Sequence, residues 1–274
     1  MKIATWNVNS IRMRLPHVVA WLTAHSPDVL LLQEVKVPTE QFPTEVFEEL
    51  GYYATVVGQK GFNGVAILSR RPLEVEHLML PGETSDGQAR YVEGVIGNVR
   101  VASLYVPNGN PIASEKFSYK LSWMDRLLSH VRSRLELEEA TVLGGDFNVC
   151  PVDSDVYDPQ AFAEDALCHP ASRARFRALC HLGLTDAVRV FHPEPGVYTF
   201  WDYQGGRWHK DEGLRIDHLL LSPQAADRLI ASGVDKGPRD QAKPSDHAPV
   251  WCELADLPPR PLLTEWGHDV STGL

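Results

Sequence analysis

The sequence predicts an α/β fold of sandwich type, and three observations support this. Short apolar runs typical of strands recur from end to end of the 274-residue chain, with helical segments between them. Hydrophobic residues make up 43% of the chain, enough for a large core. No Ser/Gly-rich or Pro-rich linker divides the chain before Ala255. We therefore expect one α/β domain over residues 1–254 and an extended tail over residues 255–274.

Strand-like segments are rich in β-branched and aromatic residues and are bounded by turn formers. The predicted strands cover residues 2–8, 29–33, 52–57, 65–69, 91–96, 99–106, 141–143, 198–201, 215–222 and 248–254.

Helices are predicted from spacing and from punctuation residues. One apolar stripe has alternating steps of four and three residues and predicts a helix with one face on the core: Phe117, Leu121, Met124, Leu128, Val131 and Leu135. Pro16 precedes the apolar residues 18–22 and predicts a helix start. Gly51 and Gly183 follow residues 46–50 and 176–182 and predict helix ends.

Charge and cysteine content narrow the class of protein. The formal net charge of −10 argues against a nucleic-acid partner, since phosphate binding relies on Lys and Arg, but DNA requires only a local basic face. The four cysteines lie far apart without a C-x-x-C pair, so we expect reduced, mostly buried thiols. We find neither an export signal nor an apolar stretch of membrane-spanning length, so we expect a soluble, cytoplasmic protein with no membrane partner.

Polar residues gather where the predicted strands begin or end. These groups are Trp6-Asn7-Val8-Asn9, Gln33-Glu34, Gly144-Gly145-Asp146-Phe147-Asn148, Arg215-Ile216-Asp217-His218 and Ser245-Asp246-His247. Each group alone is also typical of an ordinary turn. Together, their carboxylates offer the hard oxygen ligands that suit Mg²⁺ or Mn²⁺. Amide donors and a histidine beside such a metal suit hydrolysis of a phosphodiester.

Six ordered motifs resemble the exodeoxyribonuclease III family of abasic-site endonucleases, within the endonuclease/exonuclease/phosphatase superfamily, and the resemblance extends to about Leu254. They are Trp6-Asn7-Val8-Asn9-Ser10-Ile11-Arg12, Leu32-Gln33-Glu34-Val35-Lys36, Leu104-Tyr105-Val106-Pro107-Asn108-Gly109, Gly145-Asp146-Phe147-Asn148, Gly213-Leu214-Arg215-Ile216-Asp217 and Pro244-Ser245-Asp246-His247-Ala248-Pro249-Val250. This resemblance implies a four-layer sandwich of two facing, mostly antiparallel or mixed β-sheets flanked by helices.

The resemblance also implies roles for individual residues. Glu34 would be the principal metal ligand with Asn7 beside it, and the implied metal set is completed by Asp146, Asn148, Asp246 and His247. Asp146 would orient or deprotonate the attacking water, and Asn148 would donate to the scissile phosphate. His247 would contact the phosphate and be held by Asp217. Asp246 would lie near the metal, through a water.

Further positions are implied to bind substrate. Tyr105 matches a tyrosine that contacts phosphate, and a buried core tyrosine is the alternative. Asn108 would act in the same loop. Phe200 and Trp201 would line a pocket for a flipped, base-free sugar, unless they are core aromatics. Leu214 stands where some relatives carry tryptophan.

The implied function is Mg²⁺-dependent incision of duplex DNA 5′ to abasic sites, with 3′→5′ exonuclease and 3′-phosphatase activity, by a monomer. Two alternatives stay open: a superfamily phosphoesterase acting on phosphoinositide or RNA, and a non-catalytic binding protein on the same scaffold. If DNA is the substrate, basic residues should form a DNA-facing surface, and the candidates are Arg12, Arg14, Lys116, Lys120, Arg207, Lys210, Arg239 and Lys243.

Overall fold

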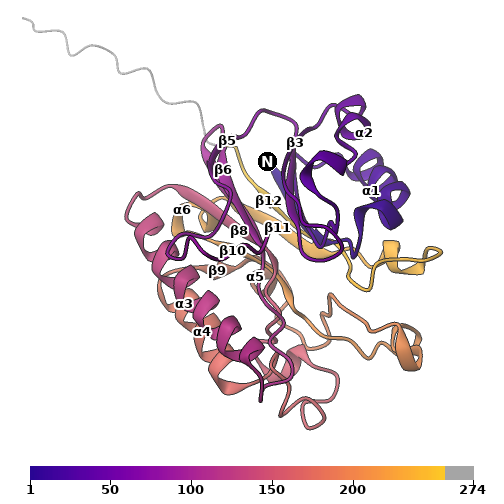
Figure 1. The fold of residues 1–274 in the computed structure, drawn as a ribbon, viewed down its shortest axis with the longest axis vertical. Helices are drawn as coiled ribbons and strands as arrows, with labels where there is room; N and C mark the ends of the chain where they lie inside the picture. Colours follow the sequence, from indigo (N-terminus) through magenta and orange to yellow (C-terminus); the bar gives the residue numbers. More distant parts are fainter. Residues whose placement is uncertain (257–274) are drawn as a thin grey trace, which may run out of the picture.

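The computed structural model describes residues 1–256, so the predicted tail from residue 257 onward lies outside the described residues. Two six-stranded sheets face each other, with helices on their outer surfaces (Figure 1). This confirms the predicted α/β sandwich of mixed sheets.

The first sheet has the order β11-β12-β1-β2-β4-β3. Only β1 and β2 run parallel, and every other neighbouring pair is antiparallel. Its strands are β1 (Lys2–Asn7), β2 (Val29–Gln33), β3 (Tyr53–Val57), β4 (Val65–Ser69), β11 (Leu229–Val234) and β12 (Val250–Leu254).

The second sheet has the order β5-β6-β7-β8-β10-β9 and likewise one parallel pair, β7 with β8. Its strands are β5 (Glu74–His77), β6 (Tyr91–Ile96), β7 (Val99–Tyr105), β8 (Ala140–Asp146), β9 (Thr185–Asp186) and β10 (Asp217–Leu221).

Two helices cover each outer surface, which gives the four layers. Helices α1 (Ile11–His25) and α2 (Thr44–Glu49) pack on the first sheet, and α3 (Glu115–Leu135) and α4 (Pro170–His181) on the second (Figure 1). Short helices lie in the connections: α5 (Ala187–Phe191), α6 (Pro223–Ala226), η1 (Thr39–Gln41), η2 (Asp153–Asp155), η3 (Gln204–Gly206), η4 (Trp208–Lys210) and η5 (Gly237–Asp240).

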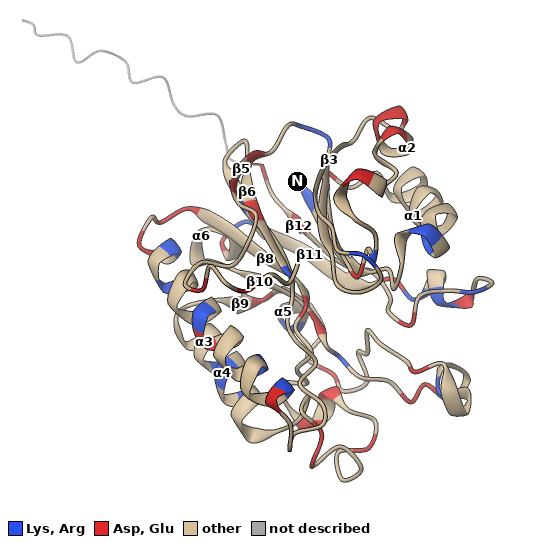
Figure 2. Ribbon diagram, in the orientation of Figure 1, with Lys and Arg blue, Asp and Glu red and all other residues tan. Residues whose placement is uncertain are grey.

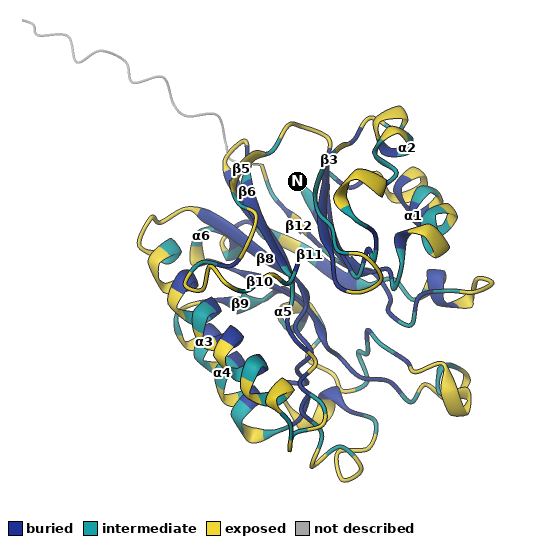
Figure 3. Ribbon diagram, in the orientation of Figure 1, coloured by how far each residue is buried: buried dark blue, intermediate teal, exposed yellow. Residues whose placement is uncertain are grey.

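The central strands of both sheets are buried, whereas the edge strands β3 and β5 and the outer sides of the helices are at least partly exposed (Figure 3). The core between the sheets is aliphatic, and two glycines of β8 allow close packing there. A Cβ on Gly144 would lie 2.5 Å from Leu31 Cδ1 of the facing sheet. A Cβ on Gly145 would lie 1.9 Å from the Leu104 carbonyl oxygen of β7. Gly144 therefore admits the facing sheet, and Gly145 admits the neighbouring strand β7.

Three element predictions were wrong. Helix α1 begins at Ile11 and contains Pro16, so this proline does not mark the helix start. The helix predicted from the apolar stripe is present as α3, and Met124 and Val131 of that stripe are buried, but the centre of the buried side is rotated toward Lys120, Trp123, Leu127 and His130. Residues 198–201 form no strand, because Phe200 makes only isolated bridges, to Leu214 and His247.

The expectation of free, mostly buried cysteines was met. All four cysteines are free thiols, with Cys150, Cys168 and Cys252 buried and Cys180 partly exposed. Within residues 1–256, no helix combines the length and hydropathy needed to cross a membrane.

Candidate active site

The predicted site residues come together because their strands share one edge. β1 and β2 run parallel, so Asn7 and Gln33 are paired at their carboxyl ends, and Glu34 follows directly. In the second sheet Asp146 is paired with both Tyr105 and Asp217. β12 runs antiparallel to β1, so His247, which precedes β12, lies at the same edge.

Glu34 and Asp146 face each other across the two sheets, with Asn7 between them. The Asn7 amide nitrogen donates to Glu34 Oε1 at 2.9 Å and to Asp146 Oδ2 at 3.0 Å. The Tyr105 hydroxyl donates to Glu34 Oε1 at 2.9 Å, and Lys36 Nζ lies 2.7 Å from Glu34 Oε2. Asn7 Oδ1 accepts from the Asn9 backbone at 3.0 Å. Asn7 thus donates hydrogen bonds to both carboxylates and links the two sheets.

His247 is held between two aspartates. Its Nδ1 lies 2.8 Å from Asp217 Oδ2, and its Nε2 lies 3.8 Å from Asp146 Oδ2. Thr199 Oγ1 donates to the same Asp217 oxygen at 2.6 Å. All four side chains are buried, so the imidazole has one orientation with Nε2 toward Asp146.

Burial and neighbouring charges shift the titration of these groups. Burial, together with the charges of Asp217 and Glu34, raises the pKa of Asp146 to about 7. Burial lowers the pKa of His247, but the charges of Asp217 and Asp146 outweigh it and raise that pKa to about 10. Burial raises the pKa of Glu34, but Lys36 and the Asn7 hydrogen bond bring it below its ordinary value. The site therefore contains a carboxyl that titrates near neutrality beside an imidazolium.

Two loop asparagines, Asn108 and Asn148, form a second group beside Asp146. Asn148 accepts a bond from Asn108 Nδ2 at 3.1 Å and donates to the Val106 carbonyl at 2.9 Å. Its backbone N–H donates to Asp146 Oδ1 at 2.9 Å. Lys120, from α3, donates to the backbone carbonyls of Asn108 and Asn148. Lys120 is fully buried, so it is no part of a DNA-facing surface, and burial lowers its pKa to about 7.

A pocket of about 260 Å³ lies next to this group. Its walls include Asn108, Phe200 and Leu214, together with Tyr157, Phe162 and Leu167. The Phe200 ring also contacts the His247 imidazole, with ring centroids 4.9 Å apart.

Trp201 does not line this pocket. It is fully buried, donates from Nε1 to Asp211, and packs edge-on against Trp208. The expectation of a Trp201 wall was wrong, because its side chain faces the opposite way from that of Phe200, as adjacent residues of an extended segment do.

The remaining candidates lie farther from the carboxylates. Asp246 Oδ1 accepts from Asn9 Nδ2 at 3.0 Å, and Arg12 is exposed and bonds Gln41. Arg239, expected on the DNA-facing surface, is instead buried and donates to the carbonyls of Ser245 and Trp201. Arg14 bonds the Asn9 and Pro244 carbonyls and the Tyr203 hydroxyl. Lys116, Lys210 and Lys243 are exposed, and Arg207 pairs with Glu212.

One group of donors here is spaced to hold a cation. One ligand atom each from Glu34, Asp146 and His247 lie within 4.8 Å of one another. The two carboxylates are hard oxygen donors, whereas an imidazolium cannot ligate a metal.

A family model described as the endonuclease/exonuclease/phosphatase family matches residues 4–247. A curated relative, exodeoxyribonuclease III of Haemophilus influenzae, is 33% identical over 266 residues, which cover 93% of this chain and all of that protein. The chain belongs to the endonuclease/exonuclease/phosphatase family. The matched region contains every site residue described above.

Solved structures agree in fold with this family member. The 3′ phosphatase NExo from Neisseria, bound to a product DNA hairpin, has 42% identity and a TM-score of 0.90, over 93% of this chain and 99% of that one. An AP endonuclease from Archaeoglobus fulgidus has 38% identity and a TM-score of 0.89, over the same shares.

Proposed function

We propose that the protein is a phosphodiesterase of DNA repair that incises duplex DNA 5′ to abasic sites and also removes 3′-terminal phosphates and nucleotides. The observation that carries the proposal is the meeting of Glu34, Asp146 and the Asp217-held His247 beside the pocket walled by Phe200 and Leu214. The names of the relatives support this substrate class, since they include an exodeoxyribonuclease, a 3′ phosphatase and an AP endonuclease.

The proposed cofactor is Mg²⁺, with Mn²⁺ as a substitute. Glu34 and Asp146 fit it, because both carboxylates converge on one point and Glu34 is ionised at neutral pH. Bound there, the ion would polarise a phosphate oxygen and offset developing charge.

The side chains would divide the remaining work. Asp146, with a pKa of about 7, accepts a proton from the attacking water. His247 carries a positive charge toward the phosphate and is oriented by Asp217. The Asn148 amide gives one hydrogen to Val106 and offers the second to the phosphate, while Asn108 positions it.

The pocket would select the sugar. Phe200 and Leu214 give it an apolar wall, and its volume of about 260 Å³ suits a deoxyribose without a base. We further propose that residues 1–254 act as a single catalytic domain and as a monomer.

The test compares four substrates with Mg²⁺ present: duplex DNA with one abasic analogue, the same duplex with a 3′-phosphate, an undamaged duplex, and a phosphoinositide. We expect a cut on the 5′ side of the abasic position, leaving a 3′-hydroxyl, with slower release from the 3′ ends. Activity on phosphoinositide alone would reject the DNA assignment, and inactivity on all four would favour a binding protein.

A further inference from the structure

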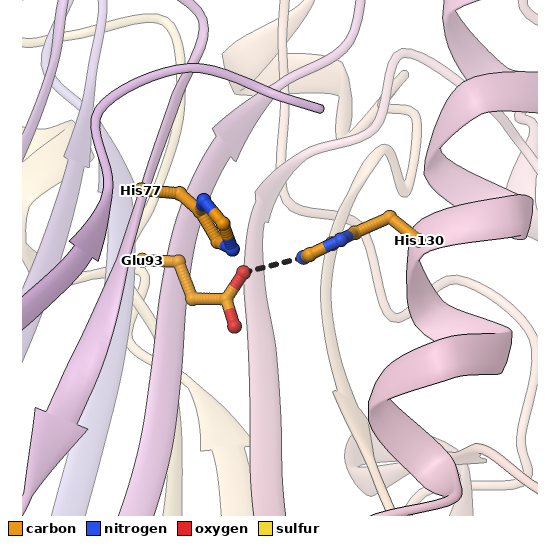
Figure 4. Close-up of side chains that lie close together, drawn as sticks. All are labelled: His77, Glu93 and His130. Carbon is orange, nitrogen blue, oxygen red and sulfur yellow. Dashed lines mark hydrogen bonds and ion pairs between the residues drawn. The ribbon is translucent and has the colours of Figure 1, made fainter. Parts of the chain in front are cut away.

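A second cluster of metal-binding side chains lies on the outer surface of the second sheet, beneath α3. It consists of His77 from β5, Glu93 from β6 and His130 from α3, and one ligand atom of each lies within 4.8 Å of the others. Figure 4 shows the three side chains pointing toward one another. Glu93 is paired with Ala102 of β7, which lies three residues before Tyr105, so the cluster is separate from the candidate active site.

The backbone of β5 places His77 opposite Glu93. The register between β5 and β6 shifts between Val75 and His77, so that His77, and not Glu76, is paired with Glu93. Such a bulge adds one residue and turns the following side chain to the other face. The imidazole thereby reaches the face that α3 covers.

We propose that His77, Glu93 and His130 bind one divalent transition-metal ion of the zinc class, which ties the edge strand β5 to α3. The donor set, two imidazoles and a carboxylate, is typical of Zn²⁺ sites in which water completes a tetrahedron. Imidazole favours borderline metals such as zinc, whereas the oxygen donors at Glu34 and Asp146 favour magnesium.

The spacing fits this coordination after small side-chain movements. Bonds of about 2.1 Å place tetrahedral ligand atoms roughly 3.4 Å apart. His130 Nε2 and Glu93 Oε2 are now 2.6 Å apart, joined by a hydrogen bond, and no pair of ligand atoms exceeds 4.8 Å. The ion would replace the proton that His130 and Glu93 share. The distance between these two ligand atoms would then increase, and the distance between the most widely separated pair of ligand atoms would decrease.

Local charge favours a cation. Glu76, Glu93 and Glu139 all pair with Arg100, and Arg134 makes one further, longer contact with Glu76. Three carboxylates therefore face two guanidinium groups.

A plain hydrogen-bond network explains only part of this cluster. Glu93 accepts bonds from Arg100 at 2.8 Å and Tyr91 at 2.7 Å, and it pairs with His130, so these groups are satisfied without an ion. His77 stands apart: within residues 1–256 its ring makes no hydrogen bond, although its centroid lies 5.1 Å from that of His130. A ligand role accounts for a ring directed into a polar cluster without a partner.

The test measures Zn²⁺ binding to the full chain by equilibrium dialysis, with millimolar Mg²⁺ present to occupy the active site. We expect one Zn²⁺ per chain and a rise in Tm, since binding to the folded state stabilises it. His77→Gln should weaken Zn²⁺ binding at least about tenfold and remove the rise in Tm, because it removes a direct ligand. This variant lies on an exposed edge strand, so it should fold. His130→Gln should act in the same way.

Two controls make the result specific. His181→Gln changes an exposed histidine of α4 and should bind Zn²⁺ like the wild type. Glu34→Gln should also retain Zn²⁺. Absence of stoichiometric zinc in the wild type would overturn the proposal, as would undiminished binding by His77→Gln. Loss of zinc in Glu34→Gln would assign the ion to the active site instead.

Discussion

The Glu34 carboxylate is fixed by three neighbouring side chains and by its own backbone. Asn7, Tyr105 and Lys36 all reach its two oxygens, and its backbone has the unusual φ of 51°. Non-glycine residues with positive φ cost energy and persist where the surroundings enforce them. The surrounding loop therefore holds this carboxylate in one orientation toward Asp146.

We expect Glu34→Gln to lower turnover of abasic duplex at least about 100-fold. The variant loses an anionic ligand, and Lewis-acid assistance is worth several kcal/mol, with about 1.4 kcal/mol per factor of ten. DNA affinity should change little. Single-turnover rates and a binding titration separate the two quantities. Glu40→Gln, which changes an exposed carboxylate nearby, should keep full activity; equal rates in the two variants would refute the role of Glu34.

The contact between Asp146 and His247 predicts coupled losses. Each of Asp146→Asn and His247→Asn should lower the rate by roughly 10²–10⁴, because both act in one transition state. Their closest atoms are 3.8 Å apart, so the double variant should lose little more than the worse single variant. A double-mutant cycle on the chemical step measures this. Multiplication of the two losses would mean that the residues act independently.

Among the elements, a buried ion network joins the segments around β9 and β10. Arg215 is 1% exposed, and its guanidinium contacts Asp155 of η2 and Asp186 of β9, each at 2.6 Å. Burial raises the pKa of Asp186, but the Arg215 charge outweighs it and brings this pKa well below its ordinary value. The network thereby positions the start of β10. The first residue of this strand, Asp217, follows Arg215 by two residues.

We expect Asp186→Asn to lower the free energy of unfolding by about 3 kcal/mol at pH 7, because it leaves part of a buried charge unpaired. A carboxyl whose pKa is lowered by folding stabilises the protein above its unfolded pKa, near 3.8. This stabilisation is lost as the pH falls from the unfolded-state pKa toward the lower pKa of the folded state. The difference in free energy of unfolding between the wild type and Asp186→Asn should therefore shrink below about pH 4. Urea titrations at pH 7, 4 and 2.5 measure it.

The control for this network is Asp153→Asn, which breaks the pair of Arg173 with an exposed carboxylate. It should cost at most about 1 kcal/mol and show little dependence on pH. If the two variants were equally stable at pH 7, the buried network would contribute no more than a surface pair.

How far the elements could be predicted depends on burial. Strands β2, β4 and β6 were predicted with their observed bounds, because their residues are almost all buried and mostly apolar. Strand β5 was missed, because Glu-Val-Glu-His at a sheet edge has no hydrophobic pattern. In α3 the polar residues Lys120 and His130 occupy buried positions, which shifted the apparent apolar stripe.

The sequence predicts which residues of the candidate active site meet. It does not predict the direction of a side chain whose orientation is decided by tertiary contacts. The motif residues Glu34, Asp146 and His247 meet as expected, since strand ends of both sheets converge at one edge of the sandwich. Phe200 and Trp201 are adjacent in sequence, but only the fold determines which ring faces the pocket. Likewise, a basic side chain such as Lys120 gives no sequence sign that two backbone carbonyls bind it in the interior.

For the molecule as a whole, the net charge of −10 is the feature that DNA binding must overcome. Figure 2 shows Asp and Glu on the loops and strands around both sheets, and Lys and Arg along α3 and α4. With Lys120 and Arg239 buried, the exposed cations nearest the motifs in sequence are Arg12, Lys116, Lys210 and Lys243. If DNA is the substrate, we therefore expect its binding to depend on few basic residues.

We expect affinity for abasic duplex to fall steeply with salt, because each neutralised phosphate contributes a slope of about −0.9 in log K against log salt. Lys116→Ala should reduce that slope by about one. Arg132→Ala removes an exposed cation of the same helix, roughly 24 Å away, and should leave the slope unchanged. Titrations in Ca²⁺ measure binding. A flat dependence in the wild type would favour a small phosphorylated substrate.

The pairing of β1 with β12 has a consequence for synthesis on the ribosome. Translation delivers β1 first, yet one of its two neighbours in the sheet, β12, is among the last segments of the described chain to appear. Until β12 has been synthesised, the peptide groups along one side of β1 lack the hydrogen-bond partners that β12 supplies in the complete sheet. His247 precedes β12 by three residues, so a nascent chain gains this imidazole only as its first sheet becomes able to close. An unfinished chain therefore lacks both the cover for its central strand and the imidazole that the proposed chemistry requires.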